Sequence, residues 1–359
     1  MKKLLGSSCG MAAAAALTLV SGSVSAQVIT VNLNAPTLDR WMYAFNSTPG
    51  LENSIPTFGA ILIDGFDDRD AQFLLGFDTP GVVPTGLDPA QYHIDSMRVT
   101  AYISADNQWV YDPSYDNVST LYPTTDPAYT PDSDANSPVQ LFSAGYRNGQ
   151  SAATFGETTP YSTTPVIPPQ AGIRSVFAAT VDAAGNTTDI SQQVRQRFDV
   201  TPMAEGQNPA LTPGQAVPAG TPIYFDVNVS DPATQAYFAR GLASGRIRVV
   251  ISSLSPASGG PGGGGGNPAY PAFYSKENAL SPVLGYAAKL NMQVSLAPAC
   301  DPDVNQDGNS DQGDVDYLIN VVAGGENSTG IDPDFNRDGN VDQGDVDSLL
   351  NVVAGGQCP

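Results

Sequence analysis

Two stretches near the C-terminus of this 359-residue chain carry oxygen-bearing side chains and glycine at a spacing that suits calcium coordination. A loop can encircle Ca²⁺ when oxygen ligands occupy positions 1, 3, 5, 7, 9 and 12 and a glycine at position 6 turns the backbone. In the first stretch these ligands are Asp303, Asn305, Asp307, Asn309 (through its backbone carbonyl), Asp311 and Asp314, with Gly308 at the turn. In the second they are Asp334, Asn336, Asp338, Asn340 (backbone carbonyl), Asp342 and Asp345, with Gly339. The sequence therefore predicts two bound Ca²⁺ ions.

The residues after each loop predict an amphipathic helix. Apolar residues follow at i, i+3, i+4 and i+7, and a glycine pair ends each run. The apolar positions are Val315, Leu318, Ile319 and Val322 in the first copy and Val346, Leu349, Leu350 and Val353 in the second. Asp replaces the usual Glu at position 12, and prolines before both loops argue against a preceding helix. We expect two EF-hand-like loop–helix units that bury their apolar stripes against each other.

Negative charge is concentrated in the same region. The chain has 36 acidic and 15 basic residues, and 13 of the acidic residues but only one basic residue, Arg337, lie between Cys300 and Pro359. Folded domains avoid such self-repulsion unless a cation relieves it. The acidity of the whole chain argues against binding to nucleic acid, because the phosphate backbone would be repelled.

The first 26 residues are typical of a secretory signal peptide. Two lysines precede a short apolar run, and small residues at Val24-Ser25-Ala26 mark a cleavage site before Gln27. The run is shorter than the roughly 20 apolar residues of a membrane-spanning helix, and no transmembrane segment is expected in the mature chain. We expect a secreted protein, extracellular or at the cell surface. Cys300 and Cys358 then remain and can form a disulfide in an oxidising environment.

The duplicated loop–helix unit in residues 300–359 resembles a type I dockerin. Cys300 and the terminal Gly355-Gly-Gln-Cys358-Pro are similar to the GC-type variant found in planctomycete-like bacteria. The resemblance implies a cohesin-like protein as partner. It also implies that Gln312 and Gly313 in the first copy, and Gln343 and Gly344 in the second, contribute to partner binding. Clostridial dockerins often carry Ser or Thr at these positions, so the resemblance implies a partner other than a cellulosomal cohesin.

Residues 27–299 predict one mainly β domain. Short stretches that alternate apolar and polar residues, typical of half-buried antiparallel strands, are separated by loops rich in proline and glycine. The predicted strands are 28–33, 60–63, 73–78, 97–103, 109–111, 175–181, 223–229, 247–251 and 290–296, with helices at 190–197 and 232–242. This pattern favours a large jelly-roll-like β-sandwich, with the glycine-rich run 259–266 as a loop within it.

Three stretches of this domain, 69–78, 94–102 and 273–278, resemble DNRLRE-type β-sandwich domains. The resemblance implies a surface or adhesive module more than an enzyme, with a polysaccharide or a cell-surface molecule as ligand. Aromatic rings can stack on sugars or pack in the core; we favour packing for the aromatic residues of this domain, with Trp109 and Tyr115 as the exceptions that we expect to be exposed.

Acidic residues of the domain offer two further hypotheses. The run Asp64, Asp67, Asp68 and Asp70 is either a structural calcium site or a solvated turn, and the irregular spacing favours the turn. Paired carboxylates could also hydrolyse a glycosidic bond. The glutamates available are Glu52, Glu157, Glu205 and Glu277, none of which lies in a catalytic motif.

We therefore expect a secreted, non-catalytic β-sandwich protein that is anchored or assembled through a calcium-dependent dockerin–cohesin interaction. One alternative is a polysaccharide hydrolase or lyase that carries the same dockerin, and another is a purely structural component of the cell envelope. The only histidine, His93, has no nucleophile elbow around it.

Overall fold

The computed structural model describes residues 27–134, 136–258, 269–296, 300–356 and 358–359. The predicted signal peptide, the glycine-rich run 259–266 and the domain boundary at residue 299 lie outside the described residues. In the described part of the chain, no helix combines the length and the apolar character needed to cross a membrane.

The described chain is mainly β, with 26% of its residues in strands and 15% in helices. The strands are β1 (Gln27–Leu33), β2 (Leu38–Met42), β3 (Ser54–Pro56), β4 (Gln72–Asp78), β5 (Tyr92–Tyr102), β6 (Val139–Tyr146), β7 (Val176–Val181), β8 (Thr187–Asp189), β9 (Ala204–Gln207), β10 (Pro222–Asp226), β11 (Arg246–Ser253), β12 (Ala272–Tyr274) and β13 (Lys289–Leu296). The helices are α1 (Gln193–Gln196), α2 (Pro232–Ala243), α3 (Ser281–Leu284), α4 (Gln312–Val322) and α5 (Gln343–Val353), with 3₁₀ turns η1 (Pro89–Gln91) and η2 (Val118–Leu121).

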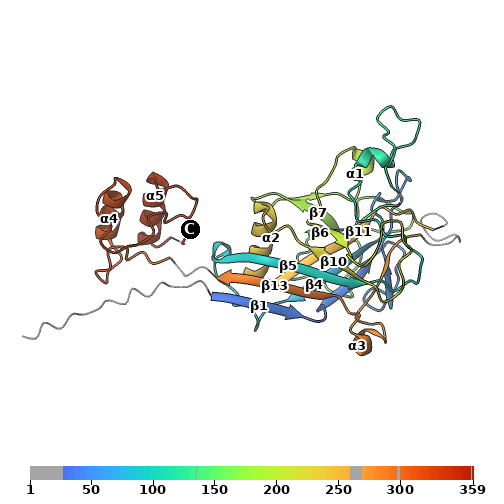
Figure 1. Cartoon of the computed structure of the whole chain (residues 1–359), viewed down its shortest axis with the longest axis horizontal. Helices are drawn as coiled ribbons and strands as arrows, with labels where there is room; N and C mark the ends of the chain where they lie inside the picture. Colours follow the sequence, from blue (N-terminus) through green and yellow to red (C-terminus); the bar gives the residue numbers. More distant parts are fainter. Residues whose placement is uncertain (1–26, 135, 259–268, 297–299, 357) are drawn as a thin grey trace, which may run out of the picture.

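Eleven strands form one antiparallel sheet that curls back over itself (Figure 1). Its order is β1-β13-β5-β10-β9-β6-β11-β4-β2, with β7 beside β6 and β8 beside β7. Short strand β9 pairs with β10 on one side and β6 on the other, so it joins the two halves of the curl. β3 and β12 form a separate pair.

Successive side chains of β4 point to opposite faces of the sheet, and each face packs into a hydrophobic core. Phe73, Leu75 and Phe77 are buried in the main core, together with residues of the neighbouring strand β11 and of β5, β10 and β13 from the other half of the curl. Leu74 points the other way and joins a second core with Phe142 of β6. The central strands are therefore buried on both faces, which explains why β4 reads as a continuous apolar run.

Helix α2 closes one side of the main core. It begins at Asp231, whose Oδ2 accepts a hydrogen bond from the backbone N–H of Thr234 at 2.8 Å, and Pro232 occupies the first turn. An N-cap carboxylate satisfies a backbone donor that has no partner within the helix. Phe238 and Leu242 then pack into the main core, and the helix contacts both β5 and β11.

The prediction of a mainly β domain is confirmed, and seven of the nine predicted strands overlap an observed one. The predictions at 60–63 and 109–111 are wrong. Residues 60–63 form a turn in which Ile63 N–H donates to the carbonyl of Ala60, and Val110 makes only an isolated bridge to Ala216. Trp109 is fully buried, so the apolar character of that stretch reflects a buried loop. The expectation that Trp109 is exposed is therefore also wrong.

Helices α4 and α5 pack against each other as expected (Figure 1). Leu318 and Leu349, the equivalent residues of the two copies, are both fully buried between them. The disulfide between Cys300 and Cys358 is present, with the two Cα atoms 5.8 Å apart. The predicted stripe is too wide, because Ile319 and Leu350 are 46% and 47% exposed. Two helices alone cover only the central part of each apolar face.

Candidate functional site

The first acidic loop is held by its own carboxylates and backbone N–H groups. Asp303 accepts hydrogen bonds from the backbone of Asp307 (Oδ1, 3.0 Å) and of Gly308 (Oδ2, 2.9 Å). Gly308 has φ of +93°, a conformation that favours glycine. At the other end, Asp314 Oδ1 accepts from Asn305 N–H at 3.0 Å and Oδ2 accepts from Asp311 N–H at 2.8 Å. Asp314 is fully buried, so this one carboxylate both closes the loop and caps α4.

The second loop repeats the same contacts with the same geometry. Asp334 accepts from the backbone N–H groups of Asp338 and Gly339 at 3.0 and 2.9 Å. Asp345, also fully buried, accepts from Asn336 and Asp342 at 3.0 and 2.8 Å. The two loops therefore have the same hydrogen-bond pattern, as expected from the duplicated sequence.

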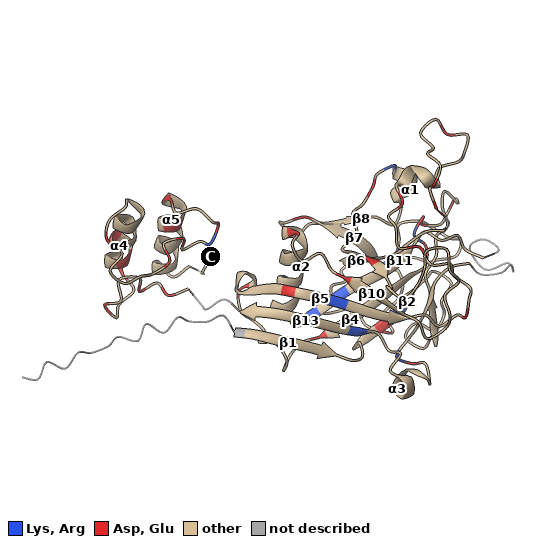
Figure 2. Cartoon of the chain, viewed as in Figure 1, with Lys and Arg blue, Asp and Glu red and all other residues tan. Residues whose placement is uncertain are grey.

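Acidic residues gather around these loops (Figure 2), and for Asp307 and Asp338 the ionised form is favoured. Hydrogen bonding to the backbone N–H of Asn309 holds the pKa of Asp307 below its usual value, and Asn340 has the same effect on Asp338. Among the described residues, however, sets of three Asp or Glu side chains with oxygens within 4.8 Å of one another occur in the β domain and not in these loops.

The residues expected to contact a partner lie at the start of each helix. Gln312 and Gln343 are exposed, and each donates from Nε2 to an aspartate one turn later at 3.0 Å, Asp316 and Asp347 respectively. Gly313 and Gly344 follow them and donate to the N-cap aspartates at 2.7 Å. Two turns along, Ile319 and Leu350 add an exposed aliphatic side chain to each helix. The apolar periodicity of the sequence predicts both side chains in the buried stripe, so it gives no sign that they lie on the surface.

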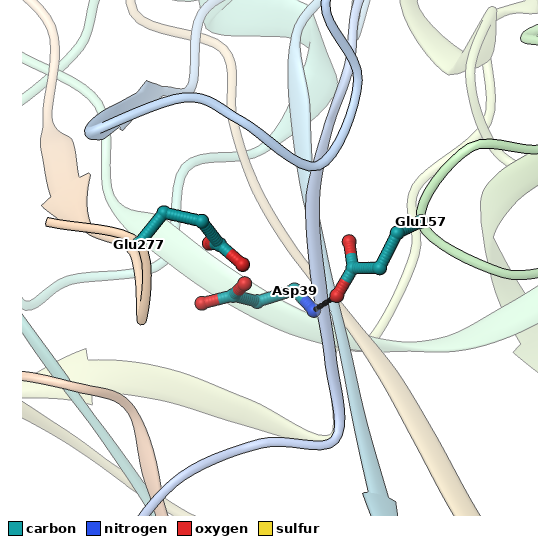
Figure 3. A group of neighbouring side chains, drawn as sticks. All are labelled: Asp39, Glu157 and Glu277. Atoms are coloured by element: carbon teal, nitrogen blue, oxygen red, sulfur yellow. Dashed lines mark hydrogen bonds between the residues drawn. The ribbon is translucent and has the colours of Figure 1, made fainter.

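In the β domain, Asp39, Glu157 and Glu277 come together from three distant segments (Figure 3). Glu157 Oε1 accepts from Asp39 N–H at 3.0 Å. The ammonium of Lys276 contacts all three carboxylates, at 2.9 Å from Asp39 Oδ1 and 3.1 Å from Glu277 Oε1. Burial raises the pKa of Asp39 to about 7, although Lys276 opposes this. The Asp39 side chain is fully buried, whereas Lys276, Glu157 and Glu277 are 25%, 28% and 22% exposed, so this cluster is an ion-pair network that is partly open to solvent.

In the acidic run between residues 64 and 70, only Asp64 is exposed as in a solvated turn; for the buried Asp67, Asp68 and Asp70 both the calcium-site and the solvated-turn hypotheses are wrong. Asp67 and Asp70 are 2% exposed and share the fully buried Arg174. Arg174 Nε donates to Asp67 Oδ2 at 2.7 Å, and its Nη2 lies 3.7 Å from Asp70 Oδ1. Asp68 is also buried and accepts from the backbone N–H of Arg195 at 2.7 Å. The counter-charges come from more than 100 residues away in the chain, which is why no local spacing revealed them.

Scans of the chain against protein-family models and against curated proteins match no family and no curated relative. A function for the loops and their helices must therefore be argued from their geometry.

Removal of Arg174 should destabilise the β domain strongly. Arg174→Met leaves Asp67 and Asp70 buried without their shared cation, and we expect a loss of about 3–5 kcal/mol in the free energy of unfolding. Arg98→Met is the matched control, because Arg98 and its partner Asp226 are 48% and 58% exposed; it should cost about 0–1 kcal/mol. Equal losses by chemical denaturation of the two variants would contradict the role assigned to Arg174.

Asp70 should make the protein less stable as the pH rises. Burial raises the pKa of Asp70 from 3.8 to about 7, against the effect of Arg174 and helped by the charge of Asp67. The folded state therefore holds a proton that the unfolded state releases, and its contribution is lost between about pH 4 and pH 7. The free energy of unfolding of the wild type should fall over this range, and in Asp70→Asn this fall should be smaller by on the order of 2–4 kcal/mol. If denaturant titrations at pH 4 to 7 show the same pH dependence of the free energy of unfolding in Asp70→Asn as in the wild type, this prediction is contradicted.

Proposed function

We propose that residues 300–359 form a dockerin-like module that binds two Ca²⁺ ions and attaches a secreted, non-catalytic, jelly-roll-like β domain to a cohesin-like partner. The observation that carries the proposal is the identical network of hydrogen bonds in the two loops. In each, the first aspartate accepts two backbone N–H groups with separate oxygens, and the last aspartate joins position 3 to the helix N-cap. Each carboxylate oxygen keeps lone pairs that a cation can use.

Calcium fits the chemistry of these loops. The donors are carboxylate, amide and carbonyl oxygens, which are the ligands of a hard cation, and neither loop offers a cysteine or histidine for a transition metal. The 13 acidic residues of this segment also need a counter-charge. The disulfide between Cys300 and Cys358 joins the two ends of the module, and in the chain-entropy model a loop of this length contributes about 4 kcal/mol.

The partner surface follows from the internal repeat. Each helix offers an exposed glutamine, a glycine and an exposed aliphatic residue at equivalent positions, ending in Ile319 on α4 and Leu350 on α5. Exposed aliphatic groups at the centre of a polar rim are typical of a protein interface. The repeat offers the same surface twice, so one partner can bind through either helix.

The β domain then acts as the displayed part of the protein. A polysaccharide or a cell-surface molecule remains our proposed ligand for it, with the half-exposed ring of Tyr115 as the aromatic contact. The alternative of a hydrolase or lyase finds little support in the Glu157–Glu277 cluster, because Lys276 lies between the carboxylates and Asp39 is buried beneath it.

Calcium binding should depend on the exposed loop aspartates. In the full mature chain, Asp307→Asn/Asp338→Asn removes one carboxylate ligand from each loop, and two Ca²⁺ ions should be lost in isothermal titration calorimetry at about 1 mM free Ca²⁺. Asp316→Asn/Asp347→Asn is the matched control, since it removes the same charge from the same segment, on helices α4 and α5 and outside the predicted ligand positions. Loss of Ca²⁺ in the control, or retention in the loop variant, would contradict the proposed sites.

Partner binding should require Ca²⁺ and at least one intact helix surface. We expect the full chain to bind one or more members of a panel of purified cohesin modules in Ca²⁺ and to release them in EGTA. Ile319→Asp or Leu350→Asp alone should weaken binding by about twofold, because the second helix remains. The double variant should lose more than about 30-fold, the effect of at least ~2 kcal/mol at a central contact. Binding that survives EGTA, or a double variant that binds normally, would contradict the proposal.

A further inference from the structure

A second group of carboxylates in the β domain, unlike the others, has no cation beside it. Asp112, Asp116 and Asp134 each place one oxygen so that all three lie within 4.8 Å of one another. They belong to the loops between β5 and β6. Asp112 and Asp134 also line a cavity of about 230 Å³ together with Tyr111, Pro213 and Gly214, so there is room for an ion and for water beside it.

The strongest indication of a ligand is an unsatisfied oxygen. Asp112 is 2% exposed, and its Oδ1 accepts hydrogen bonds from the backbone N–H and the hydroxyl of Ser114 at 2.9 and 2.5 Å. Its Oδ2 is buried and has no hydrogen-bond partner, and the same is true of Asp116 Oδ2. A buried carboxylate oxygen without a partner is costly, so something other than the protein must satisfy it.

Burial and the neighbouring acids disfavour the ionised form of this group, and a bound cation would favour it. Burial, then Asp112, Asp132 and Asp134, raise the pKa of Asp116 to about 8. Burial also raises the pKa of Asp112. Among the described residues, no Lys or Arg forms an ion pair with any of the three carboxylates. The two comparable groups of the domain each have one, Lys276 beside Asp39 and Arg174 beside Asp67.

We propose that Asp112, Asp116 and Asp134 form a Ca²⁺ site of the β domain, separate from the C-terminal loops. All of the donors are oxygens, which selects a hard cation over zinc. The carboxylates lie on irregular loops beside an open cavity, and such flexible surroundings suit Ca²⁺ with added water better than the strict octahedron of Mg²⁺. The ion would supply the positive charge that a basic side chain supplies in the other two groups, and it would tie residues 112–116 to the loop that precedes β6.

The site is tested by counting ions in the full mature chain. At about 1 mM free Ca²⁺, equilibrium dialysis should find one ion fewer in Asp112→Asn/Asp134→Asn than in the wild type. The same loss should occur in the background of the loop variant Asp307→Asn/Asp338→Asn, which isolates this site from the C-terminal loops. If the C-terminal loops bind no Ca²⁺, the wild type binds one ion and the cluster variant binds none, so failure of the proposed function and failure of this site are distinguishable.

A second probe guards against a folding defect. In the loop-variant background, Tb³⁺ bound at this site should show luminescence sensitised by the ring of Tyr111, which lines the cavity. Asp134→Asn alone, at an exposed position, should reduce this signal by more than about tenfold, as loss of a charged ligand commonly does. Asp64→Asn, an exposed acid of the same domain, should leave it unchanged. Cluster variants that fold, judged by near-ultraviolet circular dichroism, and bind Ca²⁺ and Tb³⁺ like the wild type would overturn the proposal.

Discussion

A carboxylate that leaves water must be compensated by a counter-charge or by hydrogen-bond donors, and this constraint shapes both parts of the protein. In the β domain the compensation is made by single basic side chains. Arg174 serves Asp67 and Asp70, and Lys276 serves Asp39, Glu157 and Glu277. Because each cation reaches carboxylates from distant segments, these networks also join parts of the chain that the sheet does not pair.

The C-terminal segment meets the same constraint with backbone N–H groups. Each buried position-12 aspartate accepts from two backbone donors, one at position 3 and one at the N-cap of the helix that follows. Loop, helix start and apolar core are therefore coupled: Asp314 is followed directly by Val315, which is buried against α5. A change in the charge of the loop should therefore affect the packing of the two helices, and the proposed Ca²⁺-dependent docking surface rests on this coupling.

Negative charge is thus not a uniform property of the surface. Where a basic residue is available within the fold, the acids form internal ion pairs and hold the β domain together. Where basic residues are scarce, as beside Asp112 and in the C-terminal segment with its single Arg337, the same chemistry underlies our proposal of an external cation. The distribution of 15 basic residues among 36 acidic ones decides which groups of acids are structural and which are open to a ligand.

Local patterns in the sequence determined the mainly β character of residues 27–296, the helices α2, α4 and α5, and the matched acidic loops, since these depend on periodicity and on glycine within a few residues. The sequence also identified Cys300 and Cys358 as a pair. Tertiary structure alone decided that Trp109 is buried, that Ile319 and Leu350 are exposed, and that Asp67 and Asp70 face Arg174. It alone brought Asp112, Asp116 and Asp134 together without a cation. Burial and counter-charge are set by residues more than 100 positions apart, and no local spacing records them.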